Sequence, residues 1–367
     1  MNRIYYITYS SIPSSLPSSL QIIKTCENLS KNKYKVTLIK PGTGMDKVSI
    51  KRYYGIEEDI KIKEFLSIKK FPVGFEYYLY SFYCLFFILK KKNSITITRN
   101  FFACYLLLLF KKKVILEIHH DTNIEGRITK FILRYLNFFK KSNLINIVAI
   151  SHAVKKLFVN KYKIEPKKIT VLPSGSSIKI NQLPKLYKNK RLKIGYFGSL
   201  SSSKGVELLI KLSKIDQSND YYVFGGDKNQ IRDLRKKNIN KNLHLNENIS
   251  YRVLPKKMMK MDILTLPYSK EVKSAGEVDE ISNYTSPLKL FDYLAVGKTI
   301  LSSNLKVLKE VIDHKNAYFI KNSENIFEWK KNVQIAKFNR KKNFIMSMNN
   351  FKLSKKYDHF KRVQKYL

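Results

Sequence analysis

Short apolar runs alternate with helical patterns along the first half of the chain. The runs are "RIYYITY", "YKVTLIK", "SITITR", "KVILEIHH" and "LINIVAIS". Their length and β-branched content are typical of buried strands. One of the helical patterns covers Leu20 to Lys31, with Ser18 or Ser19 as its expected N-cap. Because strands that alternate with helices build a parallel sheet covered on both faces, the pattern predicts a doubly wound α/β domain.

The same alternation restarts after a polar, basic connector. The periodicity lapses around "SSIKINQLPKLYKNKR", and a second series then runs through "LKIGYFGSL", "YYVFGG", "NLHLNEN", "DILTLPY" and "KTILSSN". We therefore expect two tandem doubly wound domains, over residues 1–185 and 186–337. The basic, amphipathic stretch 338–367 is expected to form helix that packs back toward the first domain. In such a pair of domains, ligands bind at the carboxyl ends of the strands, in a cleft.

Two apolar segments resemble membrane spans but fall short of the roughly 20 residues that cross a bilayer. They are "FEYYLYSFYCLFFIL" and "FFACYLLLLF", and we expect both to be core helices. An interfacial role stays open for the first, which is rich in aromatic residues and is followed by "KKK". Cys26, Cys84 and Cys104 lie in apolar stretches, which predicts buried thiols in a reducing compartment. The N-terminus has no signal-peptide pattern, so a cytoplasmic location is expected.

The chain is strongly basic, with 70 Lys and Arg against 28 Asp and Glu and a net charge of +42. Part of the excess fits the abundance of Lys, Asn, Ile, Tyr and Phe that an AT-rich genome encodes. Such a surface still attracts anionic lipid, nucleic acid or phosphorylated substrates. Because no nucleic-acid-binding motif accompanies the charge, we expect no nucleic-acid partner.

A glycine-bounded turn is the first candidate site. In "IGYFGSLSSSKGVELLI", a strand ends at Phe197, Gly198 permits a sharp turn, and Lys204 and Gly205 precede the next helix. Free backbone amides and the positive end of a helix dipole suit a phosphate there, and Lys204 adds a full charge. An ordinary turn with a solvated lysine explains these residues equally well.

A charged helix is the second candidate site. In "TSPLKLFDYLAVGKTILSSN", Lys289 and Asp292 are three residues apart and share a helix face. Ser286 and Pro287 are the expected N-cap and first-turn pair. Asp292 can accept two ribose hydroxyls, as the acid of dinucleotide folds does. The alternative is a salt bridge between Lys289 and Asp292 within the helix.

The segment "EIHHDT" is the third candidate site. It follows the strand that ends at Ile118, which places Glu117, His119, His120 and Asp121 at the carboxyl end of the first sheet, facing the cleft. Histidine beside a carboxylate can bind metal, act as acid or base, or hydrogen-bond a sugar hydroxyl. No further metal-spaced cluster and no D-x-D motif accompany it, so we expect no metal site.

These motifs, in this order and spacing, resemble family 4 glycosyltransferases of the GT-B fold. In the second half the resemblance is carried by "YFGSLSSSKGVELLI", "NLHLNENISYRVLPKKMMKMDILTLPYS" and "TSPLKLFDYLAVGKTILSSNLKVLKEVI". In the first half it is carried by "ITYSSIPSSLPSSLQIIKTCENLSKNKYKVTLI", "ITITR", "LEIHH" and "VAISHAVKKLFVNKYKIEPKKITVLPSG". The ordered set covers most of the chain, and it is more specific than any single piece.

The resemblance implies roles for individual residues. Lys204 is similar to the lysine that grips the donor diphosphate, Asp292 stands where the family holds the ribose hydroxyls, and His119 matches the histidine near the donor sugar. The chain also departs from the family. Ser199 replaces a common arginine, and Tyr284 replaces the first glutamate of an E-x7-E pattern. Contacts to the sugar ring are therefore expected from "SAGEVDEISNYTS", with backbone amides near Ser286 to Leu288.

The resemblance also implies the reaction. We expect a retaining, metal-independent hexosyltransferase that moves a sugar from a nucleotide-sugar donor to a glycan or lipid-linked acceptor in bacterial surface polysaccharide biosynthesis, such as capsule or lipopolysaccharide. It would need no cofactor besides the donor. The acceptor would be held at the inner face of an anionic membrane, with the enzyme peripheral to it. Another GT-B enzyme, such as a nucleotide-sugar epimerase, is the alternative, and a basic nucleic-acid-binding protein is favoured by charge alone.

Overall fold

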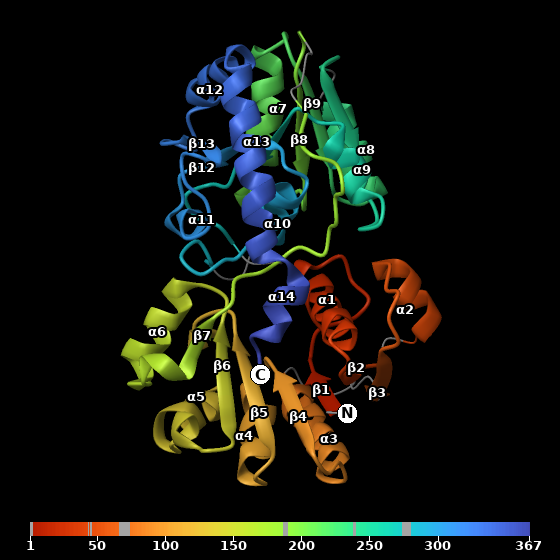
Figure 1. Ribbon diagram of the computed structural model, residues 1–367, viewed down its shortest axis with the longest axis vertical. Helices are drawn as coiled ribbons and strands as arrows, with labels where there is room; N and C mark the ends of the chain where they lie inside the picture. The colour runs from red at the N-terminus through yellow and green to blue at the C-terminus, as the bar shows by residue number, and fades with distance from the viewer. Residues whose placement is uncertain are drawn as a thin grey trace. The chain divides into compact units, whose positions relative to one another are not determined.

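The chain folds into two compact α/β units (Figure 1). A computed structural model describes residues 3–42, 44, 46–65, 74–185, 190–237, 240–273 and 280–367. Unit 1 comprises residues 1–174, 284–286 and 359–367, and unit 2 comprises residues 175–283 and 287–358. The boundaries differ from those predicted at 185 and 337, because segments 175–185 and 338–358 pack with unit 2.

Unit 1 is built on a parallel sheet of seven strands in the order β3-β2-β1-β4-β5-β6-β7. The strands are β1 (Arg3–Ile7), β2 (Lys35–Pro41), β3 (Lys61–Phe65), β4 (Ser94–Thr98), β5 (Lys113–Ile118), β6 (Leu144–Ala149) and β7 (Ile169–Val171). The strand order reverses between β1 and β4, which pair directly. This reversal is the switch point of a doubly wound sheet.

Helices cover both faces of the unit 1 sheet. They are α1 (Pro17–Lys31), α2 (Lys47–Tyr54), α3 (Phe75–Leu89), α4 (Phe101–Leu109), α5 (Arg127–Tyr135), α6 (His152–Tyr162) and α14 (His359–Gln364), with 3-10 turns η1 (Thr122–Ile124), η2 (Phe138–Lys140) and η3 (Pro166–Lys168). Apolar residues of α3, α4, α5 and α6 form one core cluster, and those of α1, α2 and α14 join another. The blue helix α14 lies beside the red helix α1 in Figure 1. The two helices also share a polar contact, because Thr25 Oγ1 and His359 Nε2 are 3.2 Å apart.

Unit 2 repeats the plan with six parallel strands in the order β10-β9-β8-β11-β12-β13. The strands are β8 (Lys193–Phe197), β9 (Asp220–Phe224), β10 (Leu243–Asn246), β11 (Ile263–Leu266), β12 (Thr299–Ser303) and β13 (Ala317–Ile320). The helices are α7 (Val206–Ile215), α8 (Lys228–Lys237), α9 (Leu254–Met259), α10 (Leu288–Ala295), α11 (Lys306–Lys309), α12 (Ile326–Phe338) and α13 (Arg340–Ser354), with 3-10 turns η4 (Ser202–Lys204) and η5 (Lys355–Tyr357). The predicted α/β fold class is confirmed, and every apolar run named as a strand forms one.

The first helix begins earlier than its serines predict. Helix α1 starts at Pro17, and its N-cap is Leu16, which makes no side-chain capping bond. The φ angle that proline fixes suits the first helical position, so the helix starts there. Ser19 lies inside the helix, and its Oγ donates to Ser11 O at 2.9 Å. The expectation of Ser18 or Ser19 as N-cap is therefore wrong.

Both apolar segments form helices of unit 1, as expected. Among the described residues, no helix combines the length and the apolar character that crossing a membrane requires. Helix α4 is almost wholly buried, whereas α3 leaves Phe75 and Phe86 more than half exposed. The thiols of Cys26, Cys84 and Cys104 are free and buried, which confirms the prediction that they are buried thiols.

A buried carboxylate joins three distant parts of unit 1. Glu117 on β5 is 1% exposed, and it accepts hydrogen bonds from the phenols of Tyr6 and Tyr366. Arg99 Nε donates to its Oε2 at 3.0 Å, and Arg362 Nη2 donates to its Oε1 at 3.1 Å. We call these five residues the Glu117 cluster. They tie β1, the end of β4 and β5 to the C-terminal helix α14.

Loss of one guanidinium from the Glu117 cluster should destabilise the protein strongly. Arg362→Met removes a buried partner of the carboxylate and leaves its charge less compensated, so the free energy of unfolding should fall by about 3 to 5 kcal/mol. The control is Arg191→Met, because Arg191 is 48% exposed in its pair with Asp220 and an exposed pair contributes at most about 1 kcal/mol. Urea unfolding followed by circular dichroism measures both. Equal losses in the two variants would contradict the assignment.

Candidate functional site

The glycine turn of unit 2 is shaped by two backbone positions that favour glycine. Gly198 follows β8 with φ of 157°, and a Cβ there would lie 2.8 Å from Lys289 Nζ. Gly205 has φ of 81°, and a Cβ there would lie 1.6 Å from the carbonyl oxygen of Pro267. Any side chain at Gly205 would therefore clash with backbone. Gly205 is also the N-cap of α7, so the predicted turn from strand to helix is present.

Two lysines approach this turn from different elements. Lys204 ends η4, and its Nζ donates to Lys273 O at 2.6 Å. Lys289 lies in the first turn of α10, and its Nζ donates to the phenol of Tyr196 at 3.1 Å. Both ammonium groups lie over the ring of Tyr268, at 5.6 Å for Lys204 and 4.9 Å for Lys289. The aromatic ring thus gathers two cations beside Gly198.

The electrostatics of the lysine pair favour an anion. Burial and the nearby charge of Lys204 hold the pKa of Lys289 well below its ordinary value. A bound anion would relieve both effects, because it compensates the buried charge and the repulsion. Ser199 lies beside the pair, exposed, with its carbonyl oxygen accepting from the Tyr196 phenol at 2.6 Å.

The start of the charged helix differs from the prediction. Helix α10 begins at Leu288, and its N-cap is Pro287, without a side-chain capping bond. Ser286 is not the cap, since its Oγ accepts from the backbone N–H of Ser174 and the residue groups with unit 1. Pro287 itself has extended geometry, with ψ of 122°, so the first helical residue is Leu288.

Lys289 and Asp292 take different partners. Asp292 is 4% exposed, and its Oδ1 accepts from Ser176 Oγ at 2.6 Å and from the Tyr251 phenol at 2.9 Å. Lys289 instead meets Tyr196 and Tyr268. The alternative of a salt bridge within the helix is therefore wrong. Asp292 fastens α10 to segments 175–185 and 249–253 of its own unit.

The "EIHHDT" segment is partly buried. The prediction that Glu117 faces a cleft is wrong, because Glu117 lies inside unit 1 in the Glu117 cluster. His119 Nε2 lies 3.9 Å from Glu117 Oε1 and has no hydrogen-bond partner among the described residues. His120 Nδ1 lies 2.9 Å from Asp121 O, and Asp121 forms an ion pair with Lys161 at 2.6 Å.

The environment of His119 keeps its ring neutral. Burial, together with the charge of Arg99, lowers the pKa of His119 to about 3. Burial by itself raises the pKa of Glu117. The charge of Arg99 opposes that effect, and the pKa of Glu117 stays well below its ordinary range. A neutral imidazole can donate or accept one hydrogen bond at each nitrogen, according to its tautomer. It suits a sugar hydroxyl better than it suits a cationic role.

Sequence reasoning missed several residues of these sites. Arg99 follows β4 directly, and its Nη2 is buried with no partner among the described residues. Tyr196 and Tyr268 support the lysine pair, and Tyr251 holds Asp292. A tyrosine in an apolar run gives no sign that its hydroxyl or ring will meet a charge. Only the position of Arg99 after a strand could have indicated a site.

Two further expectations concern sugar contacts and metal. Residues 274–279 of "SAGEVDEISNYTS" lie outside the described residues. Tyr284, in the later part of that segment, packs on the core of unit 1, and its carbonyl oxygen accepts a hydrogen bond from Ser151 Oγ at 3.3 Å. Within the described ranges, no group of three or more His, Cys, Asp or Glu is placed to hold a metal ion.

Comparison with known families places a matched domain in the second half of the chain. The model of the family "Glycosyl transferases group 1" matches residues 191–334, which contain the glycine turn and both lysines. All of this range except 284–286 belongs to unit 2. No curated protein sequence matches the chain significantly.

Solved structures match over the whole chain. A glycosyltransferase from Rickettsia africae is 16% identical with a TM-score of 0.73, over 99% of this chain and 96% of that one. HepE of Anabaena, in complex with UDP and glucose, is 12% identical with a TM-score of 0.71, over 100% and 98%. WaaG, a glycosyltransferase involved in lipopolysaccharide biosynthesis, is 12% identical with a TM-score of 0.64, over 99% and 98%.

These likenesses identify the fold as that of GT-B glycosyltransferases, with two parallel sheets surrounded by helices. Together with the domain matched at 191–334, they support a glycosyltransferase. The predicted fold is confirmed, and the broad enzyme class is supported.

The neutral state of His119 predicts a pH dependence of stability. Its pKa in the folded protein, about 3, lies below the ordinary value of 6.5, so the unfolded chain binds the proton more readily. Stability is therefore lost as the pH falls from 6.5 toward 3. At about pH 4.5 the loss from this ring should be about 3 kcal/mol.

His119→Asn should remove that part of the acid sensitivity, because asparagine stays neutral. Urea unfolding at neutral and acidic pH measures it. His314→Asn is the control, because that ring is exposed. If His119→Asn keeps the full acid sensitivity of the parent protein, the ring is not held neutral.

Proposed function

We propose that the chain is a retaining, metal-independent hexosyltransferase that uses a nucleotide-sugar donor. The observation that carries the proposal is the pair of Lys204 and Lys289 beside Gly198, inside the matched domain. Two cations gathered at the carboxyl end of β8, next to the start of a helix, form a site for a diphosphate. The acceptor is a glycan or a lipid-linked glycan of bacterial surface polysaccharide biosynthesis.

Unit 2 holds the donor in this proposal. The diphosphate contacts Lys204, Lys289 and the backbone of Gly198, Ser199 and Gly205. The nucleoside lies at the start of α10, near Ser286, Pro287 and Leu288, with Asp292 toward the ribose. Because Asp292 Oδ1 already receives two hydroxyls, a ribose would be bound by exchange with Ser176 or Tyr251.

Catalysis rests on charge and positioning. The bond between the anomeric carbon and the diphosphate oxygen breaks, and Lys204 and the helix dipole stabilise the negative charge that leaves. The acceptor hydroxyl attacks from the same face, and its proton passes to the departing phosphate oxygen. His119, which is neutral and whose Nε2 has no partner among the described residues, hydrogen-bonds the transferred sugar in this proposal. No cofactor besides the donor is required.

The location proposed for the enzyme is the inner surface of the cell membrane. A net charge of +42 attracts anionic lipid, and a lipid-linked acceptor would be held there. The likeness to WaaG, which acts in lipopolysaccharide biosynthesis, supports the same class of acceptor.

Nucleoside diphosphate binding should depend on both lysines. UDP is the first nucleotide to test, because the HepE structure contains it. Lys204→Ala and Lys289→Met should each weaken UDP binding by roughly ten- to a hundredfold, the cost of a charge-assisted contact of about 1.5 to 3 kcal/mol. Lys260→Ala, at an exposed lysine of the same unit, is the control.

UDP binding should also take up a proton. The anion favours the charged form of Lys289, whose pKa therefore rises on binding, so affinity falls as the pH rises. Calorimetric titration in buffers of different ionisation enthalpy measures the uptake, and Lys289→Met should abolish it. Uptake that persists in Lys289→Met would assign the proton to another group.

The reaction itself is tested with UDP-sugars and a membrane lipid extract as acceptor. UDP release should require the extract, chelation of metal ions should leave the rate unchanged, and NMR of the product should show the anomeric configuration of the donor. Release of free sugar without the extract would favour the epimerase alternative. Inverted product would contradict the retaining mechanism.

A further inference from the structure

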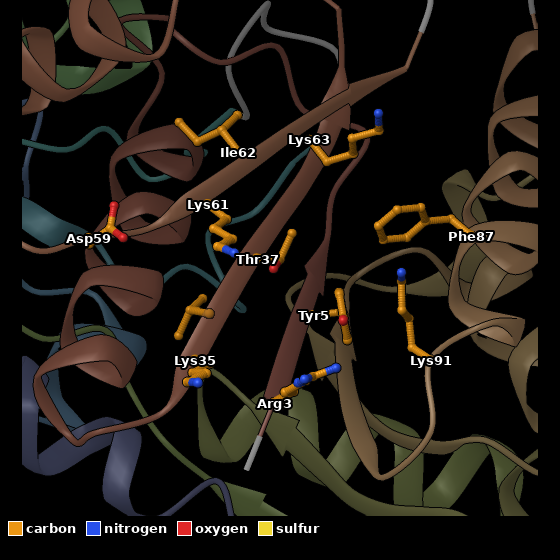
Figure 2. Close-up of a pocket in the computed structure, with 11 residues that line it drawn as sticks. Arg3, Tyr5, Lys35, Thr37, Asp59, Lys61, Ile62, Lys63, Phe87 and Lys91 are labelled. Carbon is orange, nitrogen blue, oxygen red and sulfur yellow. The ribbon is translucent and has the colours of Figure 1, made fainter. Parts of the chain in front are cut away.

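A pocket of about 560 Å³ lies on unit 1, and none of the proposed donor residues lines it. Its floor is formed by β1, β2 and β3, and Figure 2 shows Phe87 and Lys91 facing these strands from the other side. Phe87 and Lys91 come from the last turn of α3 and the residues after it. The pocket lies toward the starts of the three strands, whereas His119 follows the end of β5.

The pocket is strongly basic. The cations that line it are Arg3, Lys35, Lys61, Lys63 and Lys91. Among the described residues that line it, the one acid is Asp59, whose Oδ1 lies 3.2 Å from Lys47 Nζ and 3.4 Å from Lys51 Nζ, neither of which lines the pocket. The positive charge of the pocket is therefore not offset by its own carboxylate.

Exposed aromatic side chains continue from the pocket along α3. Tyr83 stacks on Phe65 of β3 at 6.0 Å, next to Phe87 at the rim of the pocket. From there the exposed face of α3 carries Phe86, 61% exposed, and Phe82, 40% exposed. These positions recur at helical spacing, so the rings form a stripe along one side of the helix.

Helix α5 adds a second apolar stripe on the same face of the sheet. The apolar residues that it exposes are Ile128, Phe131 and Tyr135, each at least 55% exposed. Arg127, Lys130 and Arg134 alternate with them. The opposite side of α5 packs into the same core cluster as α3 and α4, which places the two stripes on one face of unit 1.

We propose that this face of unit 1, made of the basic pocket and the stripes of α3 and α5, docks onto an anionic phospholipid bilayer. The inference deepens the proposed membrane location and rests on it. Lipid phosphates enter the basic pocket, and the aromatic rings lie at the level of the headgroups. Helices that carry charged residues beside an apolar stripe, as α5 does, lie in the plane of the membrane interface.

The chemistry of the face favours a bilayer over other occupants. A second copy of the chain would bring two cationic pockets together, which costs Coulomb energy. Nucleic acid would satisfy the charge but would leave the aliphatic and aromatic stripe of α5 without a partner. Only an anionic bilayer offers phosphate and hydrocarbon side by side over the width of both helices.

A tryptophan reporter tests the stripe directly. The chain has one tryptophan, Trp329, which is fully buried in unit 2 and provides a constant background. Phe86→Trp should show a blue-shifted emission and quenching by brominated lipid when vesicles of equimolar phosphatidylcholine and phosphatidylglycerol are added. Phe338→Trp, at an 82% exposed position of unit 2, should show neither change. Equal quenching at both positions, or at neither, overturns the proposal.

Variants matched in charge test the pocket. Lys35, Lys61 and Lys63 are exposed, and their joint change to glutamine should weaken vesicle binding about a hundredfold, at about 1 kcal/mol per lysine near the surface. The control changes Lys211, Lys236 and Lys237 of unit 2, also exposed, to glutamine, with the same loss of charge. It should weaken binding by no more than about twofold. Equal weakening would show that diffuse charge, not the pocket, binds the membrane.

Calorimetric UDP titration of the same variants separates the two proposals. Unchanged UDP affinity with lost vesicle binding supports the docking face, whereas absence of UDP binding in the parent protein contradicts the proposed enzyme alone. Sedimentation without lipid tests the two other occupants, which are a second copy of the chain and nucleic acid. A dimer, or a complex with single-stranded RNA, that the pocket variant abolishes while vesicle binding stays normal overturns the proposal.

Discussion

The buried carboxylate of Glu117 is the constraint around which unit 1 is organised. A charge removed from water is tolerated only where it is paired and hydrogen-bonded, and here Arg99, Arg362 and two phenols supply those bonds. The partners come from the start of the chain, the middle and the end. The C-terminal helix α14 is therefore part of unit 1 for an electrostatic reason as well as for its packing. The same cations lower the pKa of His119, two residues along the chain.

The charged residues of the unit 2 site are arranged differently, because two lysines lie close to each other. Lys204 and Lys289 meet over the ring of Tyr268, and the pKa of Lys289 is depressed by burial and by Lys204. Aromatic faces attract cations but do not neutralise them. The glycine turn keeps room beside the lysines, since a side chain at Gly198 would meet Lys289. Unit 1 pairs its buried carboxylate internally, whereas unit 2 presents a site that an anionic ligand would complete.

The apolar surface of unit 1 is uneven. Helices α3 and α5 expose aromatic stripes, while α1 and α2, which cover the other face, expose Leu16, Val48 and Tyr53. Exposed apolar residues are common on proteins when scattered singly, so their arrangement in stripes beside a basic pocket is the informative feature. The basic pocket thus shows where on unit 1 part of the positive charge of the chain is concentrated, which composition alone cannot show.

The sequence by itself determined the two parallel sheets, since apolar runs of strand length between helical patterns leave few other ways to bury their side chains. It also determined the glycine turn with Lys204, because Gly198 and Gly205 are local requirements of the backbone. Strands β3, β7 and β13 were not predicted, because β3 is a half-polar edge strand and β7 and β13 are only three and four residues long. Tertiary structure alone decided which charges meet. The spacing of Lys289 and Asp292 favoured a pair within the helix, but Tyr196, Tyr251 and Ser176, from distant segments, offered each group a better partner. A local pattern fixes which face of a helix a side chain lies on, whereas the fold decides what that face meets.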